Sequence, residues 1–156
     1  MNNFIETEKL ANEMAADFFK NHKYKKTANN YDVADFYITV KGKPWIGETK
    51  NRSVDTLKYD TFIMEYKKFK NMEERMQKED CKNMIYVNFF GNTCMIWDYW
   101  NIVNFGIKEK KMCRKKTAVY SEYVEKDILM LPKDRANIYT KDQDGKWTLF
   151  SKPLIK

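Results

Sequence analysis

Histidine is almost absent from this sequence, and its scarcity excludes several kinds of active site. Because His22 is the only histidine, a structural zinc site and a Ser-His or Cys-His nucleophilic system lack the residues that they need. The same shortage excludes a nuclease that binds its metal through a histidine-metal finger. Cysteine is also scarce, and Cys81, Cys94 and Cys113 are odd in number, far apart and in no C-x-x-C pair. They indicate reduced thiols in a cytosol and not a disulfide framework.

Long apolar segments are missing as well. No stretch approaches the ~18 consecutive apolar residues that would indicate a transmembrane helix. Residues 1–14 lack the basic segment and apolar run of a secretory signal. We therefore expect a cytoplasmic protein with no membrane association. Internal repeats, low-complexity linkers and a second-domain boundary are also absent, so the 156 residues predict one domain over residues 1–156.

Positive charge is present in excess. Lysine and arginine total 29 against 22 acidic residues, which gives a formal net charge of +7. This balance favours a polyanionic partner such as nucleic acid, although a lysine-rich surface that only faces water is the alternative interpretation. Hydrophobic residues make up 43% of the chain, which is enough for a folded core and too much for a disordered protein.

The periodicity of apolar residues predicts an α/β protein with two main helices. Residues 4–22 carry apolar side chains at three- and four-residue spacing, which indicates a first helix. The same spacing over residues 56–78 predicts a long second helix, with Asp55 as its N-cap. This second helix would place a row of lysines on its solvent side.

Strands are predicted by alternating or continuous apolar runs between turn residues. The expected strands cover residues 24–27, 36–40, 44–50, 83–90 and 93–99, with one or two more in 119–131. Turns are expected at residues 29–30, at Gly42, at residues 91–92 and in a closing hairpin at residues 144–145. Strands 83–90 and 93–99 are nearly all apolar, so we expect them to be central and covered on both faces. A homodimer face around residues 97–100 is an alternative use of this apolar region.

Two acids and a lysine are predicted to meet on the hairpin of residues 31–52. Successive strand side chains point to opposite faces, so Glu48 and Lys50 share one face and Thr49 points to the other. A turn at Gly42 lays the Asp35 end of one strand beside the Glu48 end of the next. Magnesium prefers carboxylate and water oxygens, lowers the pKa of bound water and offsets charge on a phosphate. The hairpin therefore predicts a metal-dependent nuclease.

A Glu-x-Lys triplet carries little weight without its context. The same triplet recurs at residues 65–67 and 109–111, and neither copy follows a hairpin headed by an acid. Without a bound cation, Glu48 and Lys50 would be a surface ion pair worth about 0–1 kcal/mol. The context of strand, turn, strand and following helix distinguishes residues 48–50 from the other two copies.

This context resembles the core of the PD-(D/E)XK nuclease superfamily. The order of helix, hairpin with Asp35, the Glu48-Thr49-Lys50 triplet, helix and strand is similar over residues 4–90, and VADFYITVKGKPWIGETKNR is similar to the motif region. The resemblance implies a restriction-endonuclease-like αβββαβ core, with a central mixed sheet flanked by helices, over about residues 4–99. Residues 100–156 would then be a C-terminal elaboration with extra strands.

The resemblance also implies roles for individual residues. Asp35 and Glu48 would bind one or two Mg²⁺ (or Mn²⁺) ions together with the main-chain carbonyl of Thr49, and Lys50 would position or activate the attacking water. One difference from the family is Val33-Ala34, which replaces the proline that often precedes the motif aspartate. Three further acids complete the set of candidates: Glu13 as the preferred helix acid, Glu6 as its alternative, and Asp32 as a rival of Asp35.

The implied activity is hydrolysis of phosphodiester bonds in DNA. Small members of the superfamily include junction-resolving enzymes, so branched or junction DNA is one implied substrate. A Lys- and Asn-rich composition of this kind resembles bacterial or phage proteins, which would place the protein in a bacterial cell or a phage-infected host. The alternative is a protein of the same fold that binds DNA or a protein partner without cleaving. The basic run at 108–116 is expected to contact phosphates, as are Lys58, Lys67, Lys68, Lys70 and Arg52.

Overall fold

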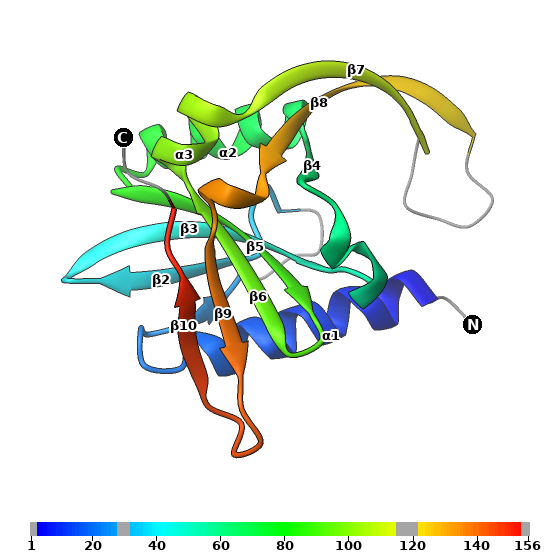
Figure 1. Cartoon of the computed structure of the whole chain (residues 1–156). Helices are drawn as coiled ribbons and strands as arrows, with labels where there is room; N and C mark the ends of the chain where they lie inside the picture. Colours follow the sequence, from blue (N-terminus) through cyan, green and yellow to red (C-terminus); the bar gives the residue numbers. More distant parts are fainter. Residues whose placement is uncertain (1–2, 28–31, 115–121, 154–156) are drawn as a thin grey trace.

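A large mixed sheet runs through the protein and is covered on both faces (Figure 1). The structure is a computed structural model, and it describes residues 3–27, 32–114 and 122–153. Helix α1 (Asn3–Phe18) packs on one face of the sheet, and helices α2 (Tyr66–Lys78) and α3 (Tyr99–Phe105) pack on the other. The α/β class that the sequence predicts is confirmed. No helix within the described residues is both long and apolar enough to span a membrane.

Seven strands form the large sheet, in the spatial order β1-β2-β3-β5-β6-β9-β10. Their bounds are β1 (Lys25–Lys26), β2 (Phe36–Val40), β3 (Lys43–Asn51), β5 (Asn83–Phe90), β6 (Thr93–Asp98), β9 (Asn137–Lys141) and β10 (Trp147–Ser151). All neighbours are antiparallel except β3 and β5, which run parallel and place Glu48 beside Tyr86 and Lys50 beside Asn88. Residues 45–47 of β3 therefore have a paired strand along both edges, whereas residues 48–51 pair with β5 alone.

A second, three-stranded sheet packs over the α2 face of the first. It consists of β4 (Thr61–Glu65), β8 (Tyr123–Pro132) and β7 (Ile107–Arg114), in the order β4-β8-β7. Strand β4 pairs with residues 128–132 of β8, β7 pairs with residues 123–130, and residues 123–127 therefore pair with β7 alone. This outer part of β7 and β8 projects from the body as a two-stranded arm (Figure 1).

Apolar side chains fill both faces of the large sheet. On the α1 side Ala15 and Phe19 pack against Phe36, and on the other side Met72 packs in a core that includes Trp97. The prediction that residues 83–90 and 93–99 are central strands covered on both faces is confirmed. A homodimer face cannot include Trp97, because that side chain is fully buried, whereas Trp100 is 60% exposed.

The predicted turns agree with the structure where it describes them. Lys41 and Gly42 both have positive φ, of 50° and 76°, so the hairpin between β2 and β3 closes with a two-residue turn that suits the twist of its strands. The strand at 24–27 is observed as β1, and the closing hairpin at 144–145 joins β9 to β10. The predicted turn at residues 29–30 lies outside the described residues, as do residues 119–121.

The prediction of one long helix over residues 56–78 is wrong in its first half. Residues Val54–Lys58 form a 3₁₀ turn that contains Asp55, and Thr61–Glu65 form strand β4 before α2 begins at Tyr66. Phe62 and Met64 alternate with less buried residues and pair with Leu131 and Leu129 of β8. Pairing with a strand that lies almost seventy residues later overrides the helical spacing, and such a pairing leaves no local signal.

Candidate active site

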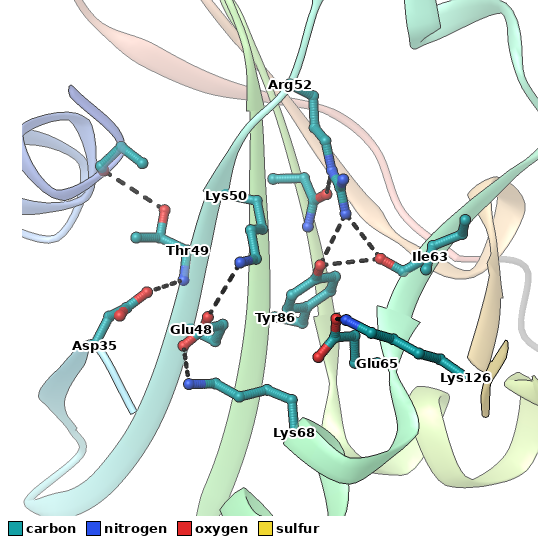
Figure 2. Close-up of polar contacts among 12 residues, drawn as sticks. Asp35, Glu48, Thr49, Lys50, Arg52, Ile63, Glu65, Lys68, Tyr86 and Lys126 are labelled. Atoms are coloured by element: carbon teal, nitrogen blue, oxygen red, sulfur yellow. Dashed lines mark hydrogen bonds and ion pairs between the residues drawn. The ribbon is translucent and has the colours of Figure 1, made fainter. Parts of the chain in front are cut away.

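The hairpin of β2 and β3 brings Asp35 next to Glu48. Phe36 pairs with Gly47 in the hairpin register, so Asp35 and Glu48 occupy the next pair of positions. Two hydrogen bonds fix Asp35: its N–H donates to the carbonyl of Gly47 at 2.9 Å, and its Oδ2 accepts from the Thr49 N–H at 2.9 Å. Figure 2 shows the Asp35 carboxylate beside β3, the strand that carries Glu48. The structure thus brings together the two acids that the sequence analysis singled out.

Glu48 is a buried carboxylate between two lysines. Its side chain is only 5% exposed, and the ammonium groups lie at 3.6 Å from Oε1 for Lys50 and at 3.0 Å from Oε2 for Lys68 (Figure 2). Burial and the neighbouring charge of Asp35 nevertheless raise the pKa of Glu48 from 4.5 to about 7, because both lysines together only partly oppose those effects. Two carboxylates at this position therefore still favour an additional cation.

Thr49 points away from this pair, toward helix α1. Its Oγ1 donates to the main-chain carbonyl of Ala11 at 3.5 Å, and both residues are buried. The alternation of Glu48, Thr49 and Lys50 between the two faces is therefore as the sequence predicts. The contact with Ala11 fixes α1 against the strand that carries the two charged residues.

Arg52 donates the hydrogen bonds of a network that lies beside the two acids. Its Nε donates to Asn88 Oδ1 at 2.7 Å, and one terminal nitrogen donates to the Ile63 carbonyl at 2.8 Å and to the Tyr86 hydroxyl at 2.9 Å. Tyr86 also donates to the Ile63 carbonyl at 3.0 Å (Figure 2). The network attaches β4 to β3 and β5. Sequence reasoning missed Tyr86 and Asn88, and the predicted DNA contact of Arg52 stays a prediction.

A cavity of about 480 Å³ lies over the two acids. It is bounded by α1, β3, β4 and the start of α2. The charged residues that line it are Glu8, Asp32, Asp35, Glu48, Lys50, Arg52, Glu65 and Lys68. Acids and bases therefore face one cavity, which can accommodate a cation and an anionic group side by side.

The helix acid that reaches the cavity is Glu8, and neither Glu13 nor Glu6 lies there. Glu13 and Glu6 are exposed, whereas Glu8 is partly buried and lines the cavity with Ala11. Helix positions three or four apart share a face, so the buried pair Ala11 and Ala15 defines the face to which Glu8 belongs. Preference for Glu13 rested on its neighbour in sequence, and adjacent helix positions do not share a face.

Asp32 also lines the cavity, but it has partners of its own. Its Oδ1 accepts from the Val33 N–H at 2.7 Å and from Arg75 at 2.9 Å. Asp35 has the position beside Glu48, and Asp32 connects the start of the hairpin to α2. The geometry therefore favours Asp35 over Asp32 as the partner of Glu48.

The donor set fits a divalent cation of the magnesium type. Among the described residues no three Asp, Glu, His or Cys side chains form a group that could hold a metal ion without other ligands. Magnesium keeps several waters and needs only one or two carboxylates, which Asp35 and Glu48 supply. The cavity over these two acids is the observation that favours this fit, because it leaves space for a cation and its waters beside both carboxylates. A contribution from the Thr49 carbonyl stays a prediction.

The remaining predicted DNA contacts lie outside the cavity. Lys58 and Lys67 are exposed, and Lys70 is hydrogen-bonded to Glu73 at 2.6 Å. In the arm, Lys108 and Lys110 lie across from acids, at 4.0 Å from Asp127 and 3.8 Å from Glu125. The basic run at 108–116 is therefore partly neutralised where the structure describes it. Its role as a phosphate-binding segment stays a prediction.

Glu48→Gln is expected to remove a pH dependence from the stability of the metal-free protein. Because the folded pKa is raised to about 7, the folded state binds the proton more strongly, and stability falls as pH rises from about 4.5 through 7. The shift corresponds to roughly 3 kcal/mol. Urea unfolding at pH 5 and pH 8 in EDTA should show the variant to be the more stable protein at pH 8 only. Equal pH slopes for both proteins would contradict the assigned environment of Glu48.

The comparisons with known proteins identify no relative of this chain. Neither a scan against protein-family models nor a search of curated proteins finds a match for this chain. What the site can do therefore has to be argued from its own residues.

Proposed function

We propose that this protein is a metal-dependent nuclease that hydrolyses phosphodiester bonds of DNA. The observation that carries the proposal is the carboxylate pair of the partly buried Asp35 and the buried Glu48, which shares a cavity with Lys50 and Lys68. A phosphodiester cleavage site needs a cation for the attacking water and cations for the phosphate, and one cavity offers positions for both.

The arrangement of elements supports the same proposal. Helix α1, antiparallel strands β1 to β3, helix α2 and the parallel strand β5 follow one another in the order of the αβββαβ core that the PD-(D/E)XK resemblance implies. Strand β4 is inserted between β3 and α2, and β6 to β10 follow the core. Asp35 directly precedes the second strand of that order, and Glu48 lies on the third.

Asp35 and Glu48 would hold the metal ion. When bound, such an ion lowers the pKa of a coordinated water and offsets the charge that develops on the scissile phosphate. Glu8 lines the same cavity and is the candidate for a further carboxylate through a water. Asp35 is held in place by the Thr49 N–H, so its free oxygen is fixed relative to Glu48 before any ligand binds.

Lys50 acts as a hydrogen-bond donor in this scheme and not as a base. Burial is the largest single effect and lowers the pKa of its ammonium, but the charges of Glu48, Tyr86 and Asp35 together outweigh it, and the pKa is raised overall. Lys50 is therefore protonated at neutral pH. A protonated lysine can orient the attacking water or a phosphate oxygen, whereas it has no lone pair with which to accept a proton.

Purified protein is expected to cleave DNA in the presence of Mg²⁺ or Mn²⁺, and Asp35→Asn is expected to lower the rate at least a hundredfold because it removes a metal ligand. The assay should compare plain duplex, flapped, branched and single-stranded DNA at equal concentration, with circular dichroism to verify folding of the variant. Binding of DNA without cleavage of any substrate with either metal would refute the enzyme and favour a protein that only binds.

A further inference from the structure

Lys68 makes the shortest contact to the buried carboxylate of Glu48. Its Nζ lies 3.0 Å from Oε2, and its side chain is 26% exposed, so it reaches into the cavity from the first turn of α2. Lys50 lies farther away, at 3.6 Å from Oε1, and is 43% exposed. Each oxygen of Glu48 thus has a lysine of its own, and the closer lysine comes from a different element of the fold (Figure 2).

The position of Lys68 is unfavourable for the helix that carries it. The first turn of a helix favours acids, because its unpaired N–H groups carry partial positive charge. Helix α2 has no acid in its first turn, and Lys67 and Lys68 stand there instead. No side chain caps this end of the helix either, since Glu65 makes no capping hydrogen bond. Local helix stability therefore does not explain Lys68, whereas its contact with Glu48 does.

We propose that Lys68 is a competing cation that occupies Glu48 in the metal-free protein and must release it before a divalent ion binds. The inference rests on the proposed function, because it concerns regulation of the same site. A magnesium ion approaches a carboxylate oxygen to about 2.0–2.1 Å. The Lys68 ammonium already lies 3.0 Å from the same oxygen of Glu48. The ammonium and the doubly charged ion would therefore repel each other strongly if both stayed on that oxygen.

Release of Lys68 also has a consequence for the substrate. Lys68 lines the cavity, so once detached from Glu48 its charge is available to a DNA phosphate in that cavity. Metal binding at Glu48 and phosphate binding at Lys68 then favour each other, because each removes the competitor of the other. Metal binding to the free protein would therefore be weakened by Lys68, and DNA would strengthen it.

The test is titration of Mn²⁺ alone into metal-free protein by calorimetry, with Lys68→Met as the variant and Lys67→Met as the matched control. Lys67 is the exposed neighbour on the same helix turn, so its substitution makes the same change in net charge without touching Glu48. Lys68→Met is expected to lower the Kd for Mn²⁺ at least tenfold, and Lys67→Met is expected to leave it within twofold of wild type. Equal Kd values for Mn²⁺ in Lys68→Met and Lys67→Met would overturn the proposal.

Two further measurements separate competition from a merely structural role and from failure of the metal site. The Mn²⁺-induced rise in Tm should be larger for Lys68→Met than for wild type, because the metal replaces a lost partner; a smaller rise would contradict the proposal. Lys68→Arg keeps the charge and should bind Mn²⁺ no more tightly than wild type. If Glu48→Gln leaves Mn²⁺ binding unchanged, or if wild type and Lys68→Met bind none, the metal site itself fails, and the proposed function with it.

Discussion

Lys50→Met is expected to lower the rate of DNA cleavage by roughly a thousandfold, at the upper end of the range of about 10²–10³ for the loss of one preorganised hydrogen-bond donor. Its ammonium lies beside the carboxylate pair and is protonated, so its loss removes the donor that orients the water or phosphate. Folding of the variant should be verified by circular dichroism, because the partner of Lys50 in this ion pair, Glu48, is only 5% exposed. Single-turnover cleavage of labelled duplex with saturating Mn²⁺ measures the effect.

The strand that carries Lys50 also offers a matched control. Lys43 lies on β3 as well, exposed and at the opposite end of the strand, so Lys43→Met makes the same chemical change away from the cavity. It should cleave at the wild-type rate. Calorimetry should show that Lys50→Met still binds Mn²⁺, since both carboxylates remain. If Lys50→Met cleaved DNA as fast as Lys43→Met, Lys50 would have no role in the reaction. If Lys50→Met no longer bound Mn²⁺, the role of Lys50 would be structural.

Gly47→Ala is expected to destabilise the protein by about 3 kcal/mol or more and to lower Tm by roughly 6–12 °C. A Cβ at residue 47 would lie 2.2 Å from the ring of Phe36, which is fully buried opposite it in the hairpin. Neither the ring nor the strand can move without disturbing Asp35 or Glu48, which are the next residues along each strand. The Tm from thermal unfolding and the rate of DNA cleavage should therefore both be lower than in wild type.

The ring of Phe36 provides the control for this substitution. A leucine at residue 36 is smaller and leaves room for the new methyl group, so the double variant Gly47→Ala, Phe36→Leu should be more stable than the sum of the single effects implies. A double-mutant cycle measures that difference. If the two changes in unfolding free energy were strictly additive, Gly47 would be needed for a reason other than leaving space for the ring of Phe36.

The parts of the fold that the sequence predicts are those with a local cause. The hairpin of β2 and β3 follows from alternation and from a turn at Gly42, and both signals lie within a few residues of the elements they define. Because the strand period is two, the same alternation places Glu48 and Lys50 on one face. The apolar strands β5 and β6 are predicted for the same reason, with Gly91 supplying the turn between them at φ 60°.

The parts that the sequence does not predict depend on contacts between distant segments. Strand β4 exists because β8 pairs with it, and its apolar spacing also fits a helix. Lys68 is predicted as a solvent-side lysine of a long helix, and it turns toward Glu48 because α2 begins only at Tyr66. Glu8 is the exception, because the spacing of Ala11 and Ala15 could have identified its face from the sequence.

The pairing of residues 45–51 of β3 with β5 implies that the strand beneath the site is held more firmly than the helices around it. Amide protons of β3 can exchange with solvent only when the sheet separates, which requires opening close to global unfolding. Lys68 comes instead from the first turn of α2, and Glu8 from the second turn of α1, and opening near a helix start costs less free energy. We expect slow hydrogen exchange at Glu48 and Lys50 and faster exchange at both helix starts. A DNA strand would then enter by displacing the two helix starts while the two acids keep their geometry.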